Sequence, residues 1–131
     1  MTSGRVLVVE DNYRNRKLVR TVLEHAGFEV VEAETGEQGV ALATVAHPDL
    51  VLMDVQLPGI DGHEALCRLR SEETTRDLPV VAVTAFAMKG DDVRALEQGF
   101  DGYIQKPISV HDLVDHVGSL IERSGPQGEA P

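Results

Sequence analysis

Five side chains that could do phosphate and metal chemistry each stand where an apolar run of the sequence ends. They are Glu10, Asp11, Asp54, Thr84 and Lys106. Three carboxylates brought together repel one another, so such a site needs a lysine or a hard divalent cation as counter-charge. Mg²⁺ suits a site of few carboxylates, because it prefers oxygen ligands and keeps several waters. Soft metals are not indicated, since the sequence has no cluster of cysteine and histidine.

A carboxylate can also act as a nucleophile toward phosphorus and form an aspartyl phosphate. The candidate is Asp54 in VLMDVQLPG, where the acid ends an apolar strand. Phosphoryl transfer needs positioning and charge neutralisation. Mg²⁺ and Lys106 could neutralise charge, and the hydroxyl of Thr84 could donate a hydrogen bond to a phosphoryl oxygen. The alternative is that Asp54 only caps the turn that follows it.

Apolar runs and amphipathic segments alternate along the chain and predict five strand–helix units. Strands are expected at residues 5–10, 28–33, 49–54, 78–85 and 101–107, and helices at 12–27, 35–48, 62–73, 90–99 and from 109 onward. Continuous apolar strands indicate a parallel sheet between two helix layers, which is an α/β fold. Ligands of such sheets bind beyond the carboxyl ends of the strands, where the candidate residues would meet.

Apolar residues at helical spacing predict which helix faces pack on the sheet. The predicted inward residues are Leu18, Val19, Val22, Leu23 and Ala26 in the first helix, Ala65, Leu66 and Leu69 in the third, and Val110, Leu113, Val114, Val117, Leu120 and Ile121 in the last. Ser109 is expected to cap the last helix, with Asp112 completing a capping box.

Length and charge narrow the range of partners. The chain has 131 residues, which favours one domain, and a formal net charge of −10, which argues against a nucleic-acid partner and an anionic membrane. Its single cysteine, Cys67, cannot form a disulfide within a monomer. No apolar run is long enough for a membrane span or a signal peptide. We therefore expect a cytoplasmic protein.

Four segments, VVEDN, LMDVQLPGIDG, VVAVTAFAMKGD and YIQKPI, resemble in order the hallmark segments of the receiver domain of bacterial two-component response regulators, the CheY-like superfamily. The third segment is most similar to DivK-type stand-alone, single-domain regulators. This resemblance implies a flavodoxin-like (βα)5 doubly wound sandwich, with a five-stranded parallel sheet in the order 2-1-3-4-5. It also implies a receiver domain over residues 1–123. Residues 124–131 are rich in glycine and proline, so we expect them to form a disordered tail.

The resemblance assigns the metal and phosphate roles residue by residue. Asp54 would be the phosphoacceptor in a two-component phosphorelay. Asp11 would bind Mg²⁺, with Glu10 acting directly or through water and the backbone carbonyl of Gln56 completing the protein ligands. Mn²⁺ is a possible substitute. Many receivers carry two aspartates where Glu10 and Asp11 stand, so Glu10 is a variant of the pattern.

Further residues would read and tune the phosphorylated state. Thr84 and Lys106 would contact the phosphoryl group, and Tyr103 would change rotamer as Thr84 moves. Gln56 and Phe86 would stand near the path of an attacking water. An apolar Phe86 would hinder that water, so a long-lived phosphorylated form is expected.

The resemblance implies a response regulator that takes a phosphoryl group from a histidine kinase or histidine phosphotransfer protein. A downstream protein would bind the surface formed by the helix at 90–99, the strand at 101–107 and the last helix. Candidate contact residues are Met88, Lys89, Arg94, Gln105, Val110 and Val114. The chain would be a monomer or weak homodimer, and no enzyme beyond its own phosphorylation and slow autodephosphorylation.

Three alternatives stay open. A phosphorelay shuttle would pass the phosphoryl group from Asp54 to a histidine phosphotransfer protein. An aspartate-nucleophile phosphatase usually carries a second acid two residues after the nucleophile, where this chain has Gln56. A pseudo-receiver would keep the fold without being phosphorylated, which the intact residue set disfavours.

Overall fold

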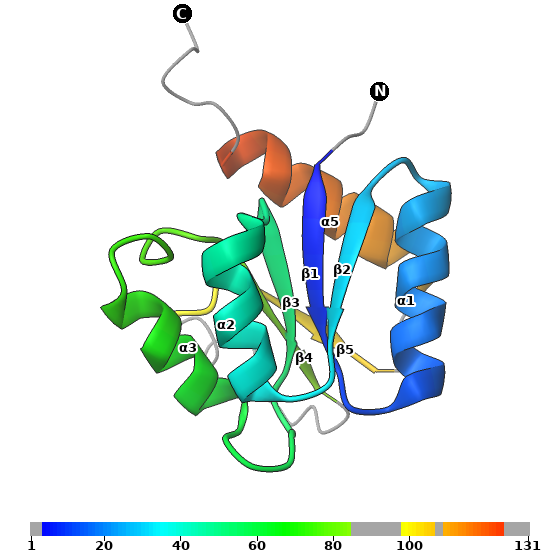
Figure 1. Ribbon diagram of the computed structural model, residues 1–131. Helices are drawn as coiled ribbons and strands as arrows, with labels where there is room; N and C mark the ends of the chain where they lie inside the picture. The colour runs from blue at the N-terminus through cyan, green and yellow to red at the C-terminus, as the bar shows by residue number, and fades with distance from the viewer. Residues whose placement is uncertain (1–3, 85–97, 107–108, 125–131) are drawn as a thin grey trace, which may run out of the picture.

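The computed structural model describes residues 4–84, 98–106 and 109–124 of the chain. Strands and helices alternate along it (Figure 1). The strands are β1 (Arg5–Val9), β2 (Glu29–Ala33), β3 (Leu50–Asp54), β4 (Val80–Thr84) and β5 (Gly102–Gln105). The helices are α1 (Tyr13–His25), α2 (Gly36–Ala46), α3 (Gly62–Ser71) and α5 (Val110–Ser124). These bounds lie within a few residues of the predicted ones.

The strands form one parallel sheet in the order β2-β1-β3-β4-β5. In Figure 1, α2 and α3 cover one face of the sheet and α1 and α5 cover the other, as the two buried clusters of side chains also show. The predicted α/β class, the flavodoxin-like sandwich and the strand order are therefore confirmed. Most of the helix predicted at residues 90–99 lies outside the described residues.

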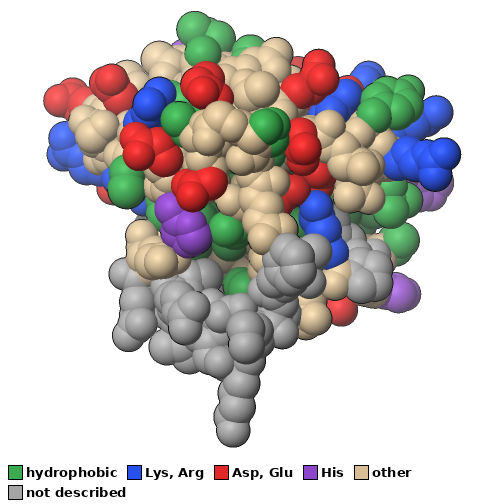
Figure 2. All heavy atoms as spheres, turned by 90° about the horizontal axis from the view of Figure 1, so that it is seen from below, with side chains coloured by type: hydrophobic (Ala, Val, Ile, Leu, Met, Phe, Trp, Pro, Cys, Tyr) green, Lys and Arg blue, Asp and Glu red, His purple; other side chains and the backbone are tan. Residues whose placement is uncertain are grey.

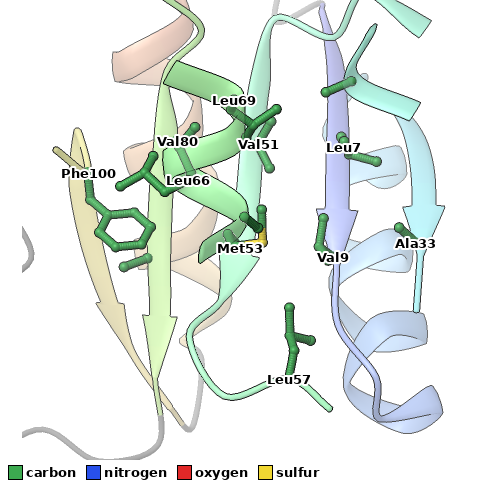
Figure 3. Close-up of a cluster of buried hydrophobic side chains, with 13 residues drawn as sticks. Leu7, Val9, Ala33, Val51, Met53, Leu57, Leu66, Leu69, Val80 and Phe100 are labelled. Carbon is green, nitrogen blue, oxygen red and sulfur yellow. The ribbon is translucent and has the colours of Figure 1, made fainter. Parts of the chain in front are cut away.

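The central strands are apolar throughout because both of their faces are buried. In β3, Val51 and Met53 point to the α2–α3 side, and Leu50 and Leu52 point to the α1–α5 side. Figure 3 shows the first of these clusters, in which Leu66 of α3 lies against the sheet. Successive strand residues face opposite sides of a sheet, so a run without polar alternation requires a helix layer on each side.

Side-chain caps fix where the helices begin after the strands. In each case the capping oxygen accepts a hydrogen bond from the backbone N–H three residues later, which stabilises a helix by about 1 kcal/mol. The pairs are Asn12 with Asn15, Thr35 with Gln38 and Asp61 with Glu64. The predicted cap at Ser109 of α5 is present but long, at 3.5 Å from the amide of Asp112.

Two predicted inward residues point to solvent instead. Leu18 is 48% exposed, and Val110 is 55% exposed. The inward stripe of α1 consists of Arg16, Val19 and Leu23, and Leu18 lies about 100° around the helix from Val19. Val110 is the first residue of α5, before the helix reaches the sheet. The predicted inward positions Ala65, Leu66 and Leu69 of α3 are confirmed, as are Leu113, Val117 and Leu120 of α5.

None of the helices in the described part of the chain combines the length and apolar composition needed to cross a bilayer.

The turn after β3 brings α3 back across the end of the strand, and Gly62 makes this possible. A Cβ at Gly62 would lie 2.7 Å from the carbonyl oxygen of Asp54 and 2.7 Å from the Cα of Val55, both backbone atoms. At Gly39 of α2, a Cβ would lie at the same distance from a side-chain atom of Val9. The first contact is with backbone, whereas the second is with a side chain.

We predict that Gly62→Ala lowers the free energy of unfolding by about 1–3 kcal/mol, the usual cost of overpacking, because backbone must shift. Gly39→Ala is the comparison, since it adds the same methyl group to a helix beside a side chain. Gly39 is interior to α2 whereas Gly62 is the first residue of α3, so about 1 kcal/mol of helix propensity is subtracted from the Gly39→Ala result. Gly39→Ala should then cost less. Urea unfolding of both variants measures the difference, and equal losses would contradict this account.

Candidate functional site

The polar candidates converge at the edge of the sheet where the strands end. Glu10 and Asp11 follow β1, Asp54 is the last residue of β3, Thr84 is the last residue of β4, and Lys106 follows β5. Figure 2 looks at the molecule from this end, and acidic side chains are prominent on the part of the face that is not grey. The sheet therefore brings together groups that are far apart in the sequence.

Three carboxylates form a compact cluster at this edge. Glu10, Asp11 and Asp54 each offer an oxygen, and these oxygens all lie within 4.8 Å of one another. Glu10 and Asp54 are each only 4% exposed, whereas Asp11 is exposed. Oxygens about 2.1 Å from a shared Mg²⁺ lie at most about 4.2 Å apart. The cluster therefore needs only a small contraction, and its all-oxygen donor set fits Mg²⁺.

The ammonium group of Lys106 lies between two of these acids. Its Nζ is 2.7 Å from Oε1 of Glu10 and 2.9 Å from Oδ2 of Asp54. Its backbone N–H donates to the carbonyl of Thr84 at 2.8 Å, which fixes Lys106 directly beyond β4. One half-buried cation is therefore shared by two buried carboxylates, and a third acid stands beside them.

Burial, hydrogen bonds and nearby charges shift the pKa values of Glu10 and Lys106. Burial raises the pKa of the Glu10 carboxyl, although hydrogen bonds from Lys106 and from the amide of Asn12 lower it, and the charge of Asp54 raises it further. Burial alone would lower the pKa of Lys106, but the hydrogen bonds and charges of Glu10 and Asp54 together outweigh it and raise that pKa. The single ammonium of Lys106 therefore does not fully offset the negative charge of ionised Glu10. This favours the binding of a second cation at the site.

Asp54 takes part in two contacts that use different oxygens. Its Oδ2 accepts from Lys106, while its Oδ1 accepts the backbone N–H of Gln56 at 2.9 Å. Asp54 can therefore cap the turn that follows it with one oxygen and have a chemical role through the other. The described contact of Gln56 with the site is through its N–H, so its carbonyl as a metal ligand stays a prediction.

Thr84 and Tyr103, which are predicted to form the switch, lie on neighbouring strands. Thr84 pairs with Gln105, and Ala82 pairs with Tyr103, on the neighbouring strands β4 and β5. Because side chains alternate between faces, Thr84 and Tyr103 project from the same face of the sheet. Thr84 is buried and Tyr103 is half-buried.

Four residues with predicted roles, Phe86, Met88, Lys89 and Arg94, lie outside the described residues. Of the other predicted contact residues, Gln105 and Val110 are exposed and Val114 is half-buried.

Two residues that contact the site were not predicted from the sequence. The backbone N–H of Asn12 donates to Oε2 of Glu10 at 3.0 Å. Arg16 is buried and donates from Nη1 to the backbone carbonyl of Glu10 at 3.0 Å. The helical spacing of the sequence could have indicated that Arg16 is buried. Arg16 stands three residues before the inward Val19 and so falls on the buried stripe of α1.

Comparison with known proteins agrees with this arrangement. Residues 6–118 match the family described as the response regulator receiver domain. The chain belongs to the receiver family of two-component response regulators. This family carries out signalling and is not a family of classical enzymes, and the resemblance predicted from the four hallmark segments is confirmed.

Similar receiver proteins cover nearly the whole domain. The polar-differentiation response regulator DivK of Brucella ovis is 45% identical over 116 residues, which are 88% of this chain and 94% of that protein. The receiver domain of a sensor histidine kinase from Pseudomonas aeruginosa, with a magnesium ion coordinated in its active-site cleft, is 32% identical with a TM-score of 0.84, covering 92% of this chain and 98% of that one. The chemotaxis response regulator CheY4 of Vibrio cholerae is 26% identical with a TM-score of 0.83, covering 91% and 99%.

Since the pKa of Glu10 in this receiver domain is raised, its ionised form is less stable in the folded than in the unfolded state. We predict that Glu10→Gln raises the free energy of unfolding at pH 7 in metal-free buffer. Below the ordinary pKa of 4.5, Glu10 is protonated in both states, so the gain should vanish there. It should appear as the pH rises through the folded-state pKa. Urea unfolding at several pH values measures it.

Glu64→Gln is the control, because this acid is exposed on the surface of α3 and should change stability by less than about 0.5 kcal/mol. A Glu10→Gln variant that is less stable than the wild type at neutral pH would show that the contact with Lys106 outweighs burial.

Proposed function

We propose that this receiver domain accepts a phosphoryl group on Asp54 from the phosphohistidine of a histidine kinase or phosphotransfer protein, in a Mg²⁺-dependent reaction. The proposal is supported above all by the contact of 2.9 Å between Nζ of Lys106 and Oδ2 of Asp54, beside two further carboxylates. A buried carboxylate that already faces a cation is poised to receive a dianionic group. The phosphorylated protein then regulates a partner.

In the proposed reaction a carboxylate oxygen of Asp54 forms a bond to phosphorus while the bond from phosphorus to the histidine nitrogen breaks. The electron pair of that bond stays on the imidazole, which takes a proton from water. Lys106 moves its hydrogen bond from Asp54 to a phosphoryl oxygen. Lys106 thus neutralises charge that develops during transfer.

Glu10, Asp11 and Asp54 would hold the divalent cation, with the backbone carbonyl of Gln56 as a further oxygen donor. Mg²⁺, or Mn²⁺ as a substitute, supplies charge neutralisation on the transferred group. Both oxygens of Glu10 already accept hydrogen bonds, from Lys106 and from the amide of Asn12. This favours a role for Glu10 through water, with Asp11 as the direct ligand.

We predict that incubation with acetyl phosphate and Mg²⁺ adds one phosphoryl group to the protein. Acetyl phosphate supplies the group without a kinase, so the test does not depend on the unknown partner. Intact mass spectrometry detects the product. Asp54→Asn should abolish the gain because the amide is not a nucleophile.

Lys106→Met should keep the acceptor and slow the reaction by about 100-fold, the usual effect of removing one preorganised donor. A wild-type protein that gains no mass would contradict the proposal and favour a pseudo-receiver. If a histidine phosphotransfer protein then takes the phosphoryl group from Asp54, the chain acts as a shuttle.

We propose that phosphorylation is read through Thr84 and Tyr103. A phosphoryl group on Asp54 adds charge and acceptor oxygens, which draw the Thr84 hydroxyl toward them. Tyr103 projects from the same face of the next strand and can fill the space that Thr84 leaves. The change would alter the surface of β5 and α5, where Gln105 and Val110 are exposed. It is a small bistable shift that a partner protein can recognise.

We predict that Mg²⁺ with beryllium fluoride, a mimic of the phosphoryl group, shifts amide resonances in a ¹⁵N correlation spectrum. The affected residues should include Asp54, Thr84, Tyr103 and Gln105. In Thr84→Ala the shifts at Asp54 should remain, while those at Tyr103 and Gln105 should fall because the link is lost. Unchanged shifts at Tyr103 in the variant would show that Thr84 does not carry the signal.

A further inference from the structure

Arg16 is a buried cation that the proposed phosphoryl transfer does not use. It lies on α1 and is only 8% exposed, on the sheet-facing stripe that also carries Val19 and Leu23. Burying a guanidinium group is unfavourable unless its N–H groups are well paired. The contacts of Arg16 therefore indicate what it does.

Arg16 links three parts of the fold beside the acid cluster. Its Nη1 donates to the backbone carbonyl of Glu10 at 3.0 Å, and its Nε donates to Oε1 of Glu32 on β2 at 2.9 Å. The guanidinium carbon lies 5.6 Å from the centre of the Tyr13 ring. Glu32 is also held by Arg20, through its other carboxylate oxygen. The guanidinium is thus fixed from several sides.

These contacts fix the backbone that carries the two acids after β1. The N–H of Glu10 donates to the carbonyl of Ala33 at 3.0 Å, and its carbonyl accepts from Arg16. That carbonyl belongs to the planar peptide unit that joins Glu10 to Asp11. A peptide plane held in this way restricts where the exposed carboxylate of Asp11 can point.

We propose that Arg16 is a positioning residue for a divalent cation, because it holds the Glu10–Asp11 peptide and so preorganises the carboxylates on either side. The inference rests on the proposed function in one respect, which is that the acid cluster binds Mg²⁺. Arg16 reaches the cation only through the backbone of Glu10, as an outer-shell partner of the metal ligands.

Charge alone makes the opposite prediction. A guanidinium beside a cation site repels the incoming metal ion, so its removal should strengthen Mg²⁺ binding. Positioning predicts that its removal weakens Mg²⁺ binding, because the ligands must then be ordered when the ion binds. The sign of the change in affinity therefore separates the two effects.

The test measures Mg²⁺ affinity by isothermal titration calorimetry in the wild type, Arg16→Met and Arg20→Met. Each substitution removes one positive charge and one salt bridge to Glu32. The two arginines lie about one turn apart on α1. Of these two arginines, Arg16 is the one that contacts the Glu10 carbonyl. We expect Arg16→Met to weaken Mg²⁺ binding by about tenfold, as loss of an outer-shell partner does. Arg20→Met should leave it unchanged or slightly stronger.

A second measurement separates positioning from a general loss of stability. The Mg²⁺ concentration that gives half the maximal rate of phosphorylation by acetyl phosphate should rise in Arg16→Met. The rate at saturating Mg²⁺ should stay near that of the wild type, since Asp54, Thr84 and Lys106 are untouched. A folded fraction well below one would raise that concentration too, because Mg²⁺ binds only the folded state. The rates are therefore compared in a variant that urea unfolding shows to be almost fully folded without Mg²⁺, where lower stability cannot change the Mg²⁺ concentration at half rate.

If Arg16→Met does not fold, the Mg²⁺ affinity is measured in Arg16→Lys instead. Lysine keeps the charge but is a single point donor, so it cannot bridge Glu32 and the Glu10 carbonyl as a guanidinium does. We expect weaker Mg²⁺ binding than in the wild type.

A folded Arg16 variant that binds Mg²⁺ as tightly as the wild type, or more tightly, overturns the inference and leaves the proposed function standing. A wild-type protein that does not bind Mg²⁺ overturns both.

Discussion

The ammonium of Lys106 is the interaction on which the rest of the site depends. It faces Glu10 and Asp54, two carboxylates that are almost fully buried and that would otherwise repel each other without solvent to screen them. Because one cation serves two acids with Asp11 beside them, the site is folded yet still short of positive charge. We expect that shortage of positive charge to attract a divalent cation. In the proposed reaction, the cation and Lys106 would then share the charge that the phosphoryl group adds to Asp54.

The sheet sets the distances over which these groups must reach. Glu10 and Lys106 follow strands that are separated by β3 and β4, with neighbouring strands about 4.8 Å apart. Only long side chains can meet across that span, and Glu10 and Lys106 both have long side chains. Glutamate has one methylene more than aspartate, and this extends the carboxylate of Glu10 toward Lys106. Asp54 needs no such reach, because its strand lies between the other two groups.

The site also depends on residues that carry no proposed chemistry. The backbone of Glu10 is held by Ala33 on one side and by Arg16 on the other. Beyond β3, the chain can return over Asp54 only because Gly62 has no side chain. Such contacts keep the polar edge of the sheet in one arrangement, although the repulsion between its acids works against that arrangement.

The amino-acid sequence predicted the fold class, the strand order implied by the hallmark segments, and the five polar residues at the strand ends, among them Asp54 and Lys106. It could do so because two-sided burial leaves an apolar run in each strand, and a polar residue at the end of such a run stands out. Only the tertiary structure shows that Lys106 bridges Glu10 and Asp54, that Leu18 faces solvent and that Arg16 donates to the Glu10 carbonyl. These facts depend on which elements lie beside one another and on how far each side chain reaches, and residue types and spacing do not encode them locally.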